Sequence, residues 1–289
     1  MNDNGSARLR VALPNKGRLA EPAATLLRDA GVDVELSERR LSAVARNAPI
    51  ELLFVRTDDI TEYVRDGLVD LGITGQDLVA ERGDGLTPLL ELGFGVCSLV
   101  LAVPARGGVS DPSALGGCRI ATTFPRLTRA FLEQRGIEAL VVEVTGAVEV
   151  TPQLGVADAV VDLVASGGTL RVNGLRPIAT LLESQAVLVA GSPVATDDPR
   201  VAALTAMLRS VSEARGREYL MMNAPASAIG RIREIIPGLS GPTVMPLADP
   251  SMIAVHSVVA RDQLWTIVPA LKEAGARDIL IVPIEKVIR

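Results

Sequence analysis

The sequence predicts an α/β fold: a larger unit in which strands and helices alternate, followed by a smaller ferredoxin-like module. The chain has 289 residues, which is more than a single small core requires. Its apolar residues change repeatedly between the spacing of buried strands and the 3.6-residue spacing of helices. The last quarter has the element order βαββαβ, the split motif of ferredoxin-like modules. The alternation before it favours largely parallel sheets covered by helices.

The elements of the first part follow one another with short loops. A strand over Leu9–Leu13 ends at the loop Pro14–Arg18, and helical spacing then runs from Leu19 to Ala30. We expect the following elements next: a strand over Ile50–Val55, a helix over Thr57–Arg65, a strand over Asp70–Thr74 and a loop over Gly75–Asp77.

A second α/β group begins near Gly95. Its expected elements are a strand over Cys97–Val103, a short helix from Asp111-Pro112, a strand over Arg119–Thr122, a helix over Leu127–Arg135, a strand over Ala139–Val144, a helix over Ala147–Leu154 and a strand over Ala159–Val164. A strand over Gln185–Ala190 and a long helix from Asp197 to about Arg215 complete the larger unit.

The C-terminal module is predicted from six elements. They are a strand over Tyr219–Met222, a helix over Ala226–Ile235, strands near Thr243–Pro246 and over Ile253–Val259, a helix over Gln263–Ala274 and a strand over Asp278–Pro283.

Composition argues against several classes of partner. The formal net charge is −5, and the Lys and Arg residues are scattered, which argues against a nucleic-acid partner. Apolar runs such as Ser98–Val103 are far shorter than the roughly 20 residues that span a bilayer. The segment Met1–Arg10 is polar and resembles no signal peptide. We therefore expect a cytoplasmic protein that binds neither membranes nor nucleic acid.

Some catalytic classes are also excluded. Cys97 and Cys118 lack the spacing of a zinc or redox pair, and His256 is the chain's one histidine. No P-loop and no Ser-His-Asp arrangement is present. We expect no metal bound by the protein alone.

The segment after the strand Ala159–Val164 has the composition of a phosphate-binding loop. Ser166, Gly167, Gly168 and Thr169 are small, so their backbone N–H groups can converge on one oxyanion. Asp162 lies near the end of that strand, where ligands of α/β sheets bind. An ordinary strand-to-helix turn is the alternative interpretation, because small residues also serve as structural punctuation.

The spacing from Glu149 through Gly155 and Asp162 to Leu170 resembles the pattern of the ATP phosphoribosyltransferase family, the first enzyme of histidine biosynthesis. The Asp-x-x-x-Ser-Gly-x-Thr core also resembles the phosphoribosyl pyrophosphate motif of other phosphoribosyltransferases. Those enzymes usually carry a second acid where this chain has Val161, and Asp158 is a candidate substitute. The resemblance extends from about Leu9 to the closing segment Ile279–Lys286.

The resemblance implies a two-lobed catalytic unit like periplasmic binding proteins, plus a regulatory ferredoxin-like domain. Lobe I would comprise residues 1–95 with 185–212, lobe II residues 96–184, and the regulatory domain residues 217–289. It further implies transfer of the phosphoribosyl group to N1 of ATP, Mg²⁺ delivered with the substrate phosphates, feedback inhibition by histidine, and homo-oligomers built from dimers to hexamers.

Site residues follow from the resemblance position by position. The expected catalytic residues are Asp162, Glu149 and Asp158. Phosphoribosyl pyrophosphate would contact Asp158, Asp162, Ser166, Gly167, Gly168, Thr169 and Leu170; ATP would contact Asn15, Lys16, Gly17, Arg18, Thr74, Gly75 and Asp77; histidine would contact Asn223, Leu239, Thr243 and Asp278. Asn223 stands where at least one relative has an acid, so an ion pair to the ligand's amino group is lost.

Each of these segments also has a structural interpretation. The loops at Asn15–Arg18 and Gly72–Asp77 are alternatively solvated turns, and Glu149 is alternatively a surface acid. At the level of the whole chain, the rival function is a non-catalytic two-lobed ligand-binding or amino-acid-sensing protein.

Overall fold

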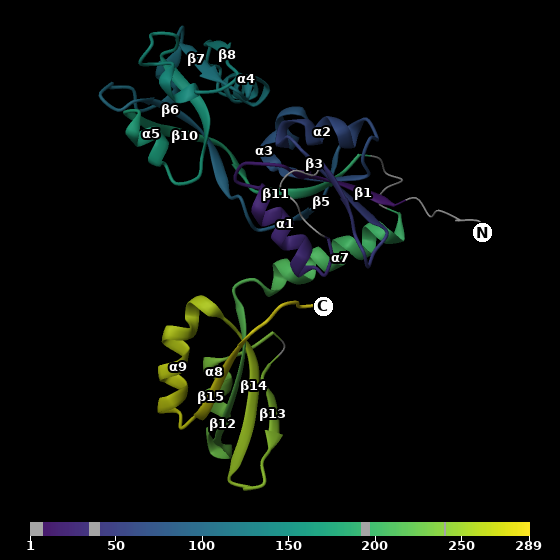
Figure 1. Cartoon of the computed structure of the whole chain (residues 1–289). Helices are drawn as coiled ribbons and strands as arrows, with labels where there is room; N and C mark the ends of the chain where they lie inside the picture. The colour runs from purple at the N-terminus through teal and green to yellow at the C-terminus, as the bar shows by residue number, and fades with distance from the viewer. Residues whose placement is uncertain (1–7, 35–40, 192–196, 240) are drawn as a thin grey trace, which may run out of the picture. The chain divides into compact units, whose positions relative to one another are not determined.

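The computed structural model describes residues 8–34, 41–191, 197–239 and 241–289. Residues 1–7 of the polar N-terminal segment lie outside the described residues. The chain divides into two compact units, Met1–Thr205 and Ala206–Arg289 (Figure 1). The boundary falls inside helix α7 (Pro199–Ala214). Each unit has its own sheets and hydrophobic core.

The first unit contains two sheets. The first sheet has the strand order β2-β3-β1-β4-β11-β5. Its strands are β1 (Leu9–Pro14), β2 (Ser42–Val44), β3 (Ile50–Val55), β4 (Leu71–Gly75), β5 (Thr87–Glu91) and β11 (Ala186–Ala190). Three helices connect them: α1 (Ala20–Asp29), α2 (Thr57–Arg65) and α3 (Gln76–Arg82).

The second sheet has the order β10-β6-β9-β7-β8. Its strands are β6 (Cys97–Pro104), β7 (Arg119–Thr122), β8 (Leu140–Glu143), β9 (Ala159–Val164) and β10 (Leu175–Ser184). The helical segments around it are η1 (Pro112–Leu115), α4 (Pro125–Gln134), the single turn η2 (Val148–Val150) and α5 (Gly168–Val172). The expected helix over 147–154 is therefore one 3₁₀ turn, and Ala147 before it has a left-handed φ of 50°.

The expectation of largely parallel sheets is only half right. The trios β3-β1-β4 and β8-β7-β9 are parallel. However, β11 runs antiparallel to β4 and β5, and β6 runs antiparallel to β9 and β10. These antiparallel strands include those that connect one sheet to the other. Within each parallel trio, helices connect the strands, as the alternation of strands and helices predicts.

The chain crosses between the sheets at two adjacent places. It leaves the first sheet after β5 and enters the second at β6, and it returns from β10 to β11 with Gln185 as the one residue between the strands. Cys97 and Ser184 are paired at the end of the β6-β10 ladder. The strand β10 was not predicted, because its polar and half-exposed residues hide the apolar pattern.

The helices pack closely on these sheets. The backbone of β4 approaches α2 so tightly at Gly72 that an added Cβ would lie 2.4 Å from Ile60 Cγ2. Helix α3 begins directly at Gln76 with Gly75 as its N-cap, so the loop expected over Gly75–Asp77 is instead the start of a helix. The side chain of Leu78 in α3 packs in the hydrophobic cluster of the second sheet.

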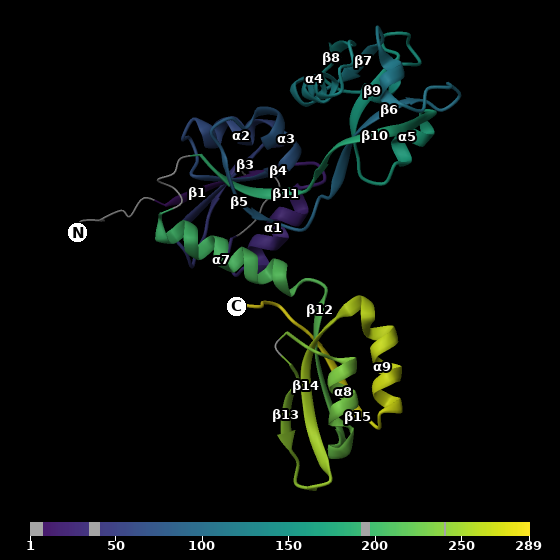
Figure 2. The same cartoon turned by 180° about the vertical axis from the view of Figure 1, so that it is seen from behind.

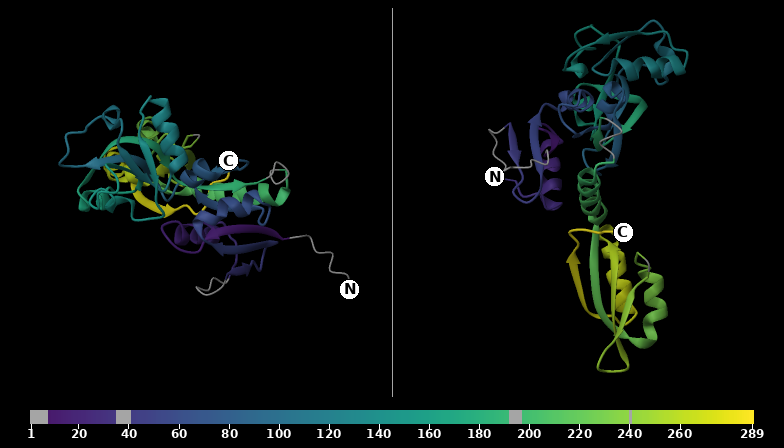
Figure 3. Two further views of the ribbon diagram at one scale, coloured as in Figure 1. Left: turned by 90° about the horizontal axis from the view of Figure 1, so that it is seen from above. Right: turned by 90° about the vertical axis from the view of Figure 1, so that its right-hand side faces the viewer.

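The second unit has the predicted βαββαβ order. Its elements are β12 (Arg217–Pro225), η3 (Ala226–Ala228), α8 (Ile229–Ile235), β13 (Thr243–Pro246), β14 (Met252–Ala260), η4 (Arg261–Gln263), α9 (Leu264–Glu273) and β15 (Arg277–Pro283). The sheet order is β13-β14-β12-β15, and the pairs are antiparallel. Both α8 and α9 cover one face of the sheet, where they bury a common core (Figures 2 and 3).

Candidate active site

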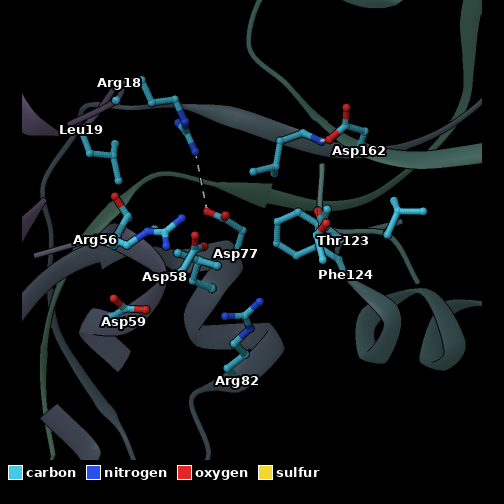
Figure 4. Close-up of a pocket in the computed structure, with 17 residues that line it drawn as sticks. Arg18, Leu19, Arg56, Asp58, Asp59, Asp77, Arg82, Thr123, Phe124 and Asp162 are labelled. Carbon is cyan, nitrogen blue, oxygen red and sulfur yellow. Dashed lines mark hydrogen bonds and ion pairs between the residues drawn. The ribbon is translucent and has the colours of Figure 1, made fainter. Parts of the chain in front are cut away.

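The first unit contains a pocket of about 600 Å³ (Figure 4). Its walls are the segments at the carboxyl ends of all six parallel strands: β1, β3 and β4 of the first sheet, and β7, β8 and β9 of the second. Ligands of α/β proteins bind at this edge because loops and helix N-termini meet there. The lining residues used below are Gly17, Arg18, Arg56, Asp58, Asp59, Gly75, Asp77, Leu78, Arg82, Thr123, Phe124, Asp162 and Leu163.

Arg18 lies at the point where the loop after β1 meets the strands that cross between the sheets. One guanidinium nitrogen donates to the carbonyl oxygen of Gly95, and the other lies 3.0 Å from Cys97 Sγ. The same guanidinium is 3.8 Å from Asp77 Oδ1 (Figure 4). The side chain is 38% exposed, so part of this cation remains available to a ligand in the pocket.

The carboxylate of Asp77 is buried and already engaged. Ser184 Oγ donates to Asp77 Oδ1 at 2.5 Å, and the backbone N–H of Asp77 donates back to Ser184 Oγ at 3.0 Å. Asp77 therefore ties the first turn of α3 to the strand that crosses between the sheets. Burial raises the pKa of the neighbouring Cys97 thiol, and the Arg18 cation opposes that shift.

Asp162 is on β9 and faces the pocket. Burial raises the pKa of its carboxyl to about 6, the backbone N–H of Leu163 lowers it, and the negative charge of Glu149 raises it further. The structure thus brings Glu149, on the turn η2, into electrostatic range of Asp162. A carboxyl group in a pocket whose pKa is raised by burial and by a neighbouring negative charge is a candidate for a functional position.

Asp158 is at the opposite end of β9. Its carboxylate accepts hydrogen bonds from the backbone N–H of Arg119 at 2.8 Å and from the Arg119 guanidinium at 3.2 Å. These bonds hold the pKa of Asp158 below its usual range. Four residues of strand, about 13 Å, separate Asp158 from Asp162, and Asp158 is not among the residues that line the pocket. The structure does not bring Asp158 to the site.

The loop expected to hold a phosphate follows the end of β9, and its residues are not among those that line the pocket. Gly167 has a φ of 71° and is the N-cap of the short helix α5. Ser166 and Thr169 are exposed, whereas Leu170 is 3% exposed and belongs to the hydrophobic core. Thr169 and Ser166 therefore keep hydroxyls at the surface, and the side chain of Leu170 anchors the helix rather than facing a ligand.

The residues expected to contact ATP divide into two groups. Gly17, Arg18, Gly75 and Asp77 line the pocket. Asn15 and Lys16 are exposed in the same loop but are not part of the lining. Thr74 is fully buried, and its hydroxyl lies 3.4 Å from the carbonyl oxygen of Thr57, so it contributes to packing between β4 and α2.

Two arginines of the pocket were missed by the sequence analysis. Arg56 is the N-cap residue of α2, and Arg82 is the last residue of α3 (Figure 4). Arg56 follows β3 directly, so its place after a predicted strand was an available signal. Arg82 had no such signal, because α3 was not predicted.

The second unit brings together two of the four residues expected to bind histidine. Asn223 Nδ2 donates to Asp278 Oδ2 at 3.1 Å. Asp278 has a φ of 51°, an unusual conformation for a residue other than glycine, and the β12-β15 ladder is irregular between Met221 and Asn223. Thr243 is paired with His256 across β13 and β14, and Leu239 is exposed in the loop before β13.

The described ranges contain no group of three or more His, Cys, Asp or Glu side chains with the geometry of a metal site. No described helix has both the length and the apolar composition needed to cross a bilayer.

We predict that Asp162→Asn stabilises the protein at neutral pH. A carboxyl whose pKa is raised on folding binds more protons in the folded state, so its burial lowers the unfolding free energy as pH rises from about 4 through about 6. The amide removes that cost, roughly 3 kcal/mol at pH 7.5, and less at pH 4.5. Urea unfolding at both pH values measures the difference; a variant that is less stable than the parent at pH 7.5 would contradict this account.

Comparison with known proteins identifies the family. The ATP phosphoribosyltransferase family matches residues 56–210, and the family described as HisG, C-terminal domain, matches residues 214–286. The ATP phosphoribosyltransferase of Methanocella arvoryzae is 46% identical over 97% of this chain and 100% of its own length. The corresponding protein of Gemmatimonas aurantiaca is 44% identical over 97% and 99%.

Solved structures agree with these matches. The ATP phosphoribosyl transferase (HisG:HisZ) complex from Thermotoga maritima has a TM-score of 0.59 and 28% identity, over 70% of this chain and 98% of that chain. Tv2483 bound to L-arginine, with a TM-score of 0.50 and 12% identity over 70% and 84%, shares the fold alone. The expected fold class, a two-lobed periplasmic-binding-protein-like unit followed by a ferredoxin-like module, is confirmed. The chain belongs to the ATP phosphoribosyltransferase family, in the long form that carries the C-terminal domain.

Proposed function

We propose that the pocket at the strand ends is the place where this enzyme performs the reaction of its family. It transfers the phosphoribosyl group of phosphoribosyl pyrophosphate to N1 of ATP and releases pyrophosphate, the first step of histidine biosynthesis. The observation that carries the proposal is the convergence of six strand ends on one pocket that contains both Asp162 and a set of arginines. A non-catalytic ligand-binding protein is not favoured, because near-full-length relatives are transferases.

The reaction forms a bond from N1 of adenine to the anomeric carbon as the bond from that carbon to pyrophosphate breaks. Positive charge develops on the ribose ring, and the leaving group carries negative charge away. The ionised carboxylate of Asp162 suits the ribose hydroxyls and the developing positive charge. The backbone N–H groups from Ser166 to Thr169 suit the 5-phosphate, with Gly167 in the left-handed conformation that opens this turn.

The arginines of the pocket suit the phosphate chains of the two substrates. Arg18, Arg56 and Arg82 all line it, and guanidinium groups bind phosphate oxygens with two parallel hydrogen bonds. Lys16, in the exposed loop next to Gly17, adds a further cation at the rim. Holding two polyanions in line is the main catalytic task of such a site.

Mg²⁺ enters this proposal as part of the substrate. Oxygen donors of phosphate are the ligands that Mg²⁺ prefers together with one or two carboxylates. The pocket lining offers such carboxylates at Asp58, Asp59 and Asp162. The ion would neutralise the charge of the departing pyrophosphate.

The C-terminal module is the proposed site of feedback inhibition by histidine. The Asp278 carboxylate, held by Asn223, can pair with the amino group of the ligand, although Asn223 supplies an amide where a relative has an acid. Inhibition then requires a coupling of about 1–3 kcal/mol between module and active site. A cytoplasmic location, where ATP is available, and assembly into dimers and hexamers are further parts of the proposal.

Asp162→Asn tests the function at the active site. The variant should lower kcat/KM for phosphoribosyl pyrophosphate roughly 10- to 100-fold, because hydrogen bonds to a charged group are lost. The assay is pyrophosphate release that requires both ATP and phosphoribosyl pyrophosphate. Asp158→Asn, on the same strand but bonded to Arg119, is the matched control and should stay near the parent. Equal effects of the two variants would refute the role of Asp162.

Asp278→Asn tests the regulatory assignment. The neutral side chain cannot pair with the ligand's amino group, so the histidine concentration that halves activity should rise about tenfold or more. Activity without histidine should be unchanged. Inhibition curves measured at fixed substrate concentrations provide the comparison, and an unaltered curve would remove Asp278 from the site.

A further inference from the structure

The N-terminus of helix α4 lacks a cap from its own segment. Phe124, the N-cap residue, makes no side-chain capping bond, and Pro125 at the first position has no N–H. The N–H of Thr128 already bonds to the carbonyl oxygen of Phe124 at 3.0 Å. The backbone N–H groups of Arg126 and Leu127 are therefore the two donors that need an external acceptor.

Glu81 supplies both acceptors from another part of the unit. Its Oε1 accepts from Arg126 N at 2.8 Å and its Oε2 from Leu127 N at 2.9 Å. Glu81 is on α3, which follows β4 of the first sheet, whereas α4 follows β7 of the second. The residue is 7% exposed, and its negative charge also complements the N-terminal end of the helix.

The contact has a direct consequence for the pocket. Leu78 and Arg82 on α3 line one side of it, and Thr123 and Phe124, immediately before α4, line another. Glu81 is one residue before Arg82 and joins these two walls. A cap made by a nearby residue, as in most helices, would stabilise α4 without fixing its distance from α3.

A second contact supports the same joint between α3 and the N-terminus of α4. Leu78, three residues before Glu81, packs among side chains of the second sheet's core, including Phe124. The buried face of α3 thus carries an apolar anchor and a carboxylate, and both are used across the joint between the sheets. A surface pair, Arg126 with Asp84 at 2.7 Å, lies beside them, but Asp84 is 82% exposed and such pairs contribute little.

We propose that Glu81 is a positioning residue that sets the separation of the two pocket walls and thereby the affinity for the substrates. The inference rests on the proposed function, because the walls matter for turnover only if the pocket is the active site. Glu81 itself touches no substrate in this account; it acts through Thr123, Phe124 and Arg82.

Three substitutions of Glu81 in the full chain test the proposal. Glu81→Gln keeps the side-chain length but has one oxygen acceptor in place of two. Glu81→Asp keeps the charge and both oxygens, but its side chain is shorter by about one carbon–carbon bond. Glu81→Ala has neither the reach nor the acceptors. We expect KM for phosphoribosyl pyrophosphate and for ATP to rise about tenfold in Glu81→Asp and Glu81→Gln, and more in Glu81→Ala, with kcat changed less than threefold. Asp84→Asn, the control, should leave both constants unchanged.

The pattern separates positioning from a general electrostatic role. If charge at the helix end were all that mattered, Glu81→Asp would match the parent and Glu81→Gln would not; that result would overturn the proposal, as would unchanged KM in all variants. If Glu81→Ala does not fold, the two conservative variants decide the question. A loss of kcat without a rise in KM would also contradict it.

A measurement without substrates keeps this inference separate from the proposed function. Hydrogen–deuterium exchange of the full chain should be faster in Glu81→Gln for peptides that contain residues 123–128 and 76–82, and unchanged elsewhere in the first unit. Parental exchange rates in these peptides would refute the joint. Absence of substrate-dependent pyrophosphate release by the unsubstituted enzyme would instead refute the proposed function. The exchange rates would still show whether Glu81 holds α3 and α4 together.

Discussion

The first unit depends on the buried contact between Asp77 and Ser184. The chain passes between the two sheets twice, before Cys97 and after Ser184, and these passages are neighbours in the β6-β10 ladder. Asp77 and Ser184 exchange two hydrogen bonds at that crossing, so the start of α3 is fixed to the strands that join the sheets. A buried carboxylate has a small desolvation penalty only while its hydrogen-bond partner is in place. The local geometry at the crossing therefore depends on both Asp77 and Ser184. The Arg18 guanidinium lies beside Asp77 and Cys97, and Arg18 also lines the pocket, so the contact and the pocket share this residue.

Helix α3 connects this constraint with the chemistry of the site. Its seven residues include two buried carboxylates one turn apart, Asp77 at the crossing strands and Glu81 at the N-terminus of α4. Between them, Leu78 packs in the core of the second sheet. Because Gly75, Asp77, Leu78 and Arg82 also line the pocket, the element that joins the sheets is itself a wall of the active site. Asp162, on the far wall, accepts a hydrogen bond from the backbone N–H of Leu163, and burial raises the pKa of its carboxyl to about 6.

Local patterns predicted those parts of the structure that depend on neighbours in sequence. The strands Ile50–Val55, Arg119–Thr122 and Ala159–Val164 have the predicted bounds, because their pattern of apolar residues is local to each segment. The order of the C-terminal module was predicted for the same reason. Asp162 was predicted as a site residue, and it lines the pocket, because its position near the end of a strand can be recognised from the local sequence.

The strand β10 and helix α3 were missed, since Pro177 and the polar residues of β10 break its pattern and α3 is only seven residues long. The bonds of Asp77 to Ser184 and of Glu81 to Arg126 join residues 107 and 45 positions apart, so no local spacing could reveal them. Asp158 was placed by analogy with a neighbouring acid, but strand geometry puts it at the other end of β9.

We propose that the carboxyl ends of β7, β8 and β9 hold phosphoribosyl pyrophosphate while the first sheet's loops hold ATP. A crystal structure of the enzyme with phosphoribosyl pyrophosphate, Mg²⁺ and a non-reactive ATP analogue tests it most directly. We expect the 5-phosphate on the backbone N–H groups between Ser166 and Thr169, the ribose hydroxyls on Asp162, and the ATP phosphates near Arg18. A 5-phosphate bound at Asn15–Arg18 instead, with Asp162 away from the ribose, would contradict it.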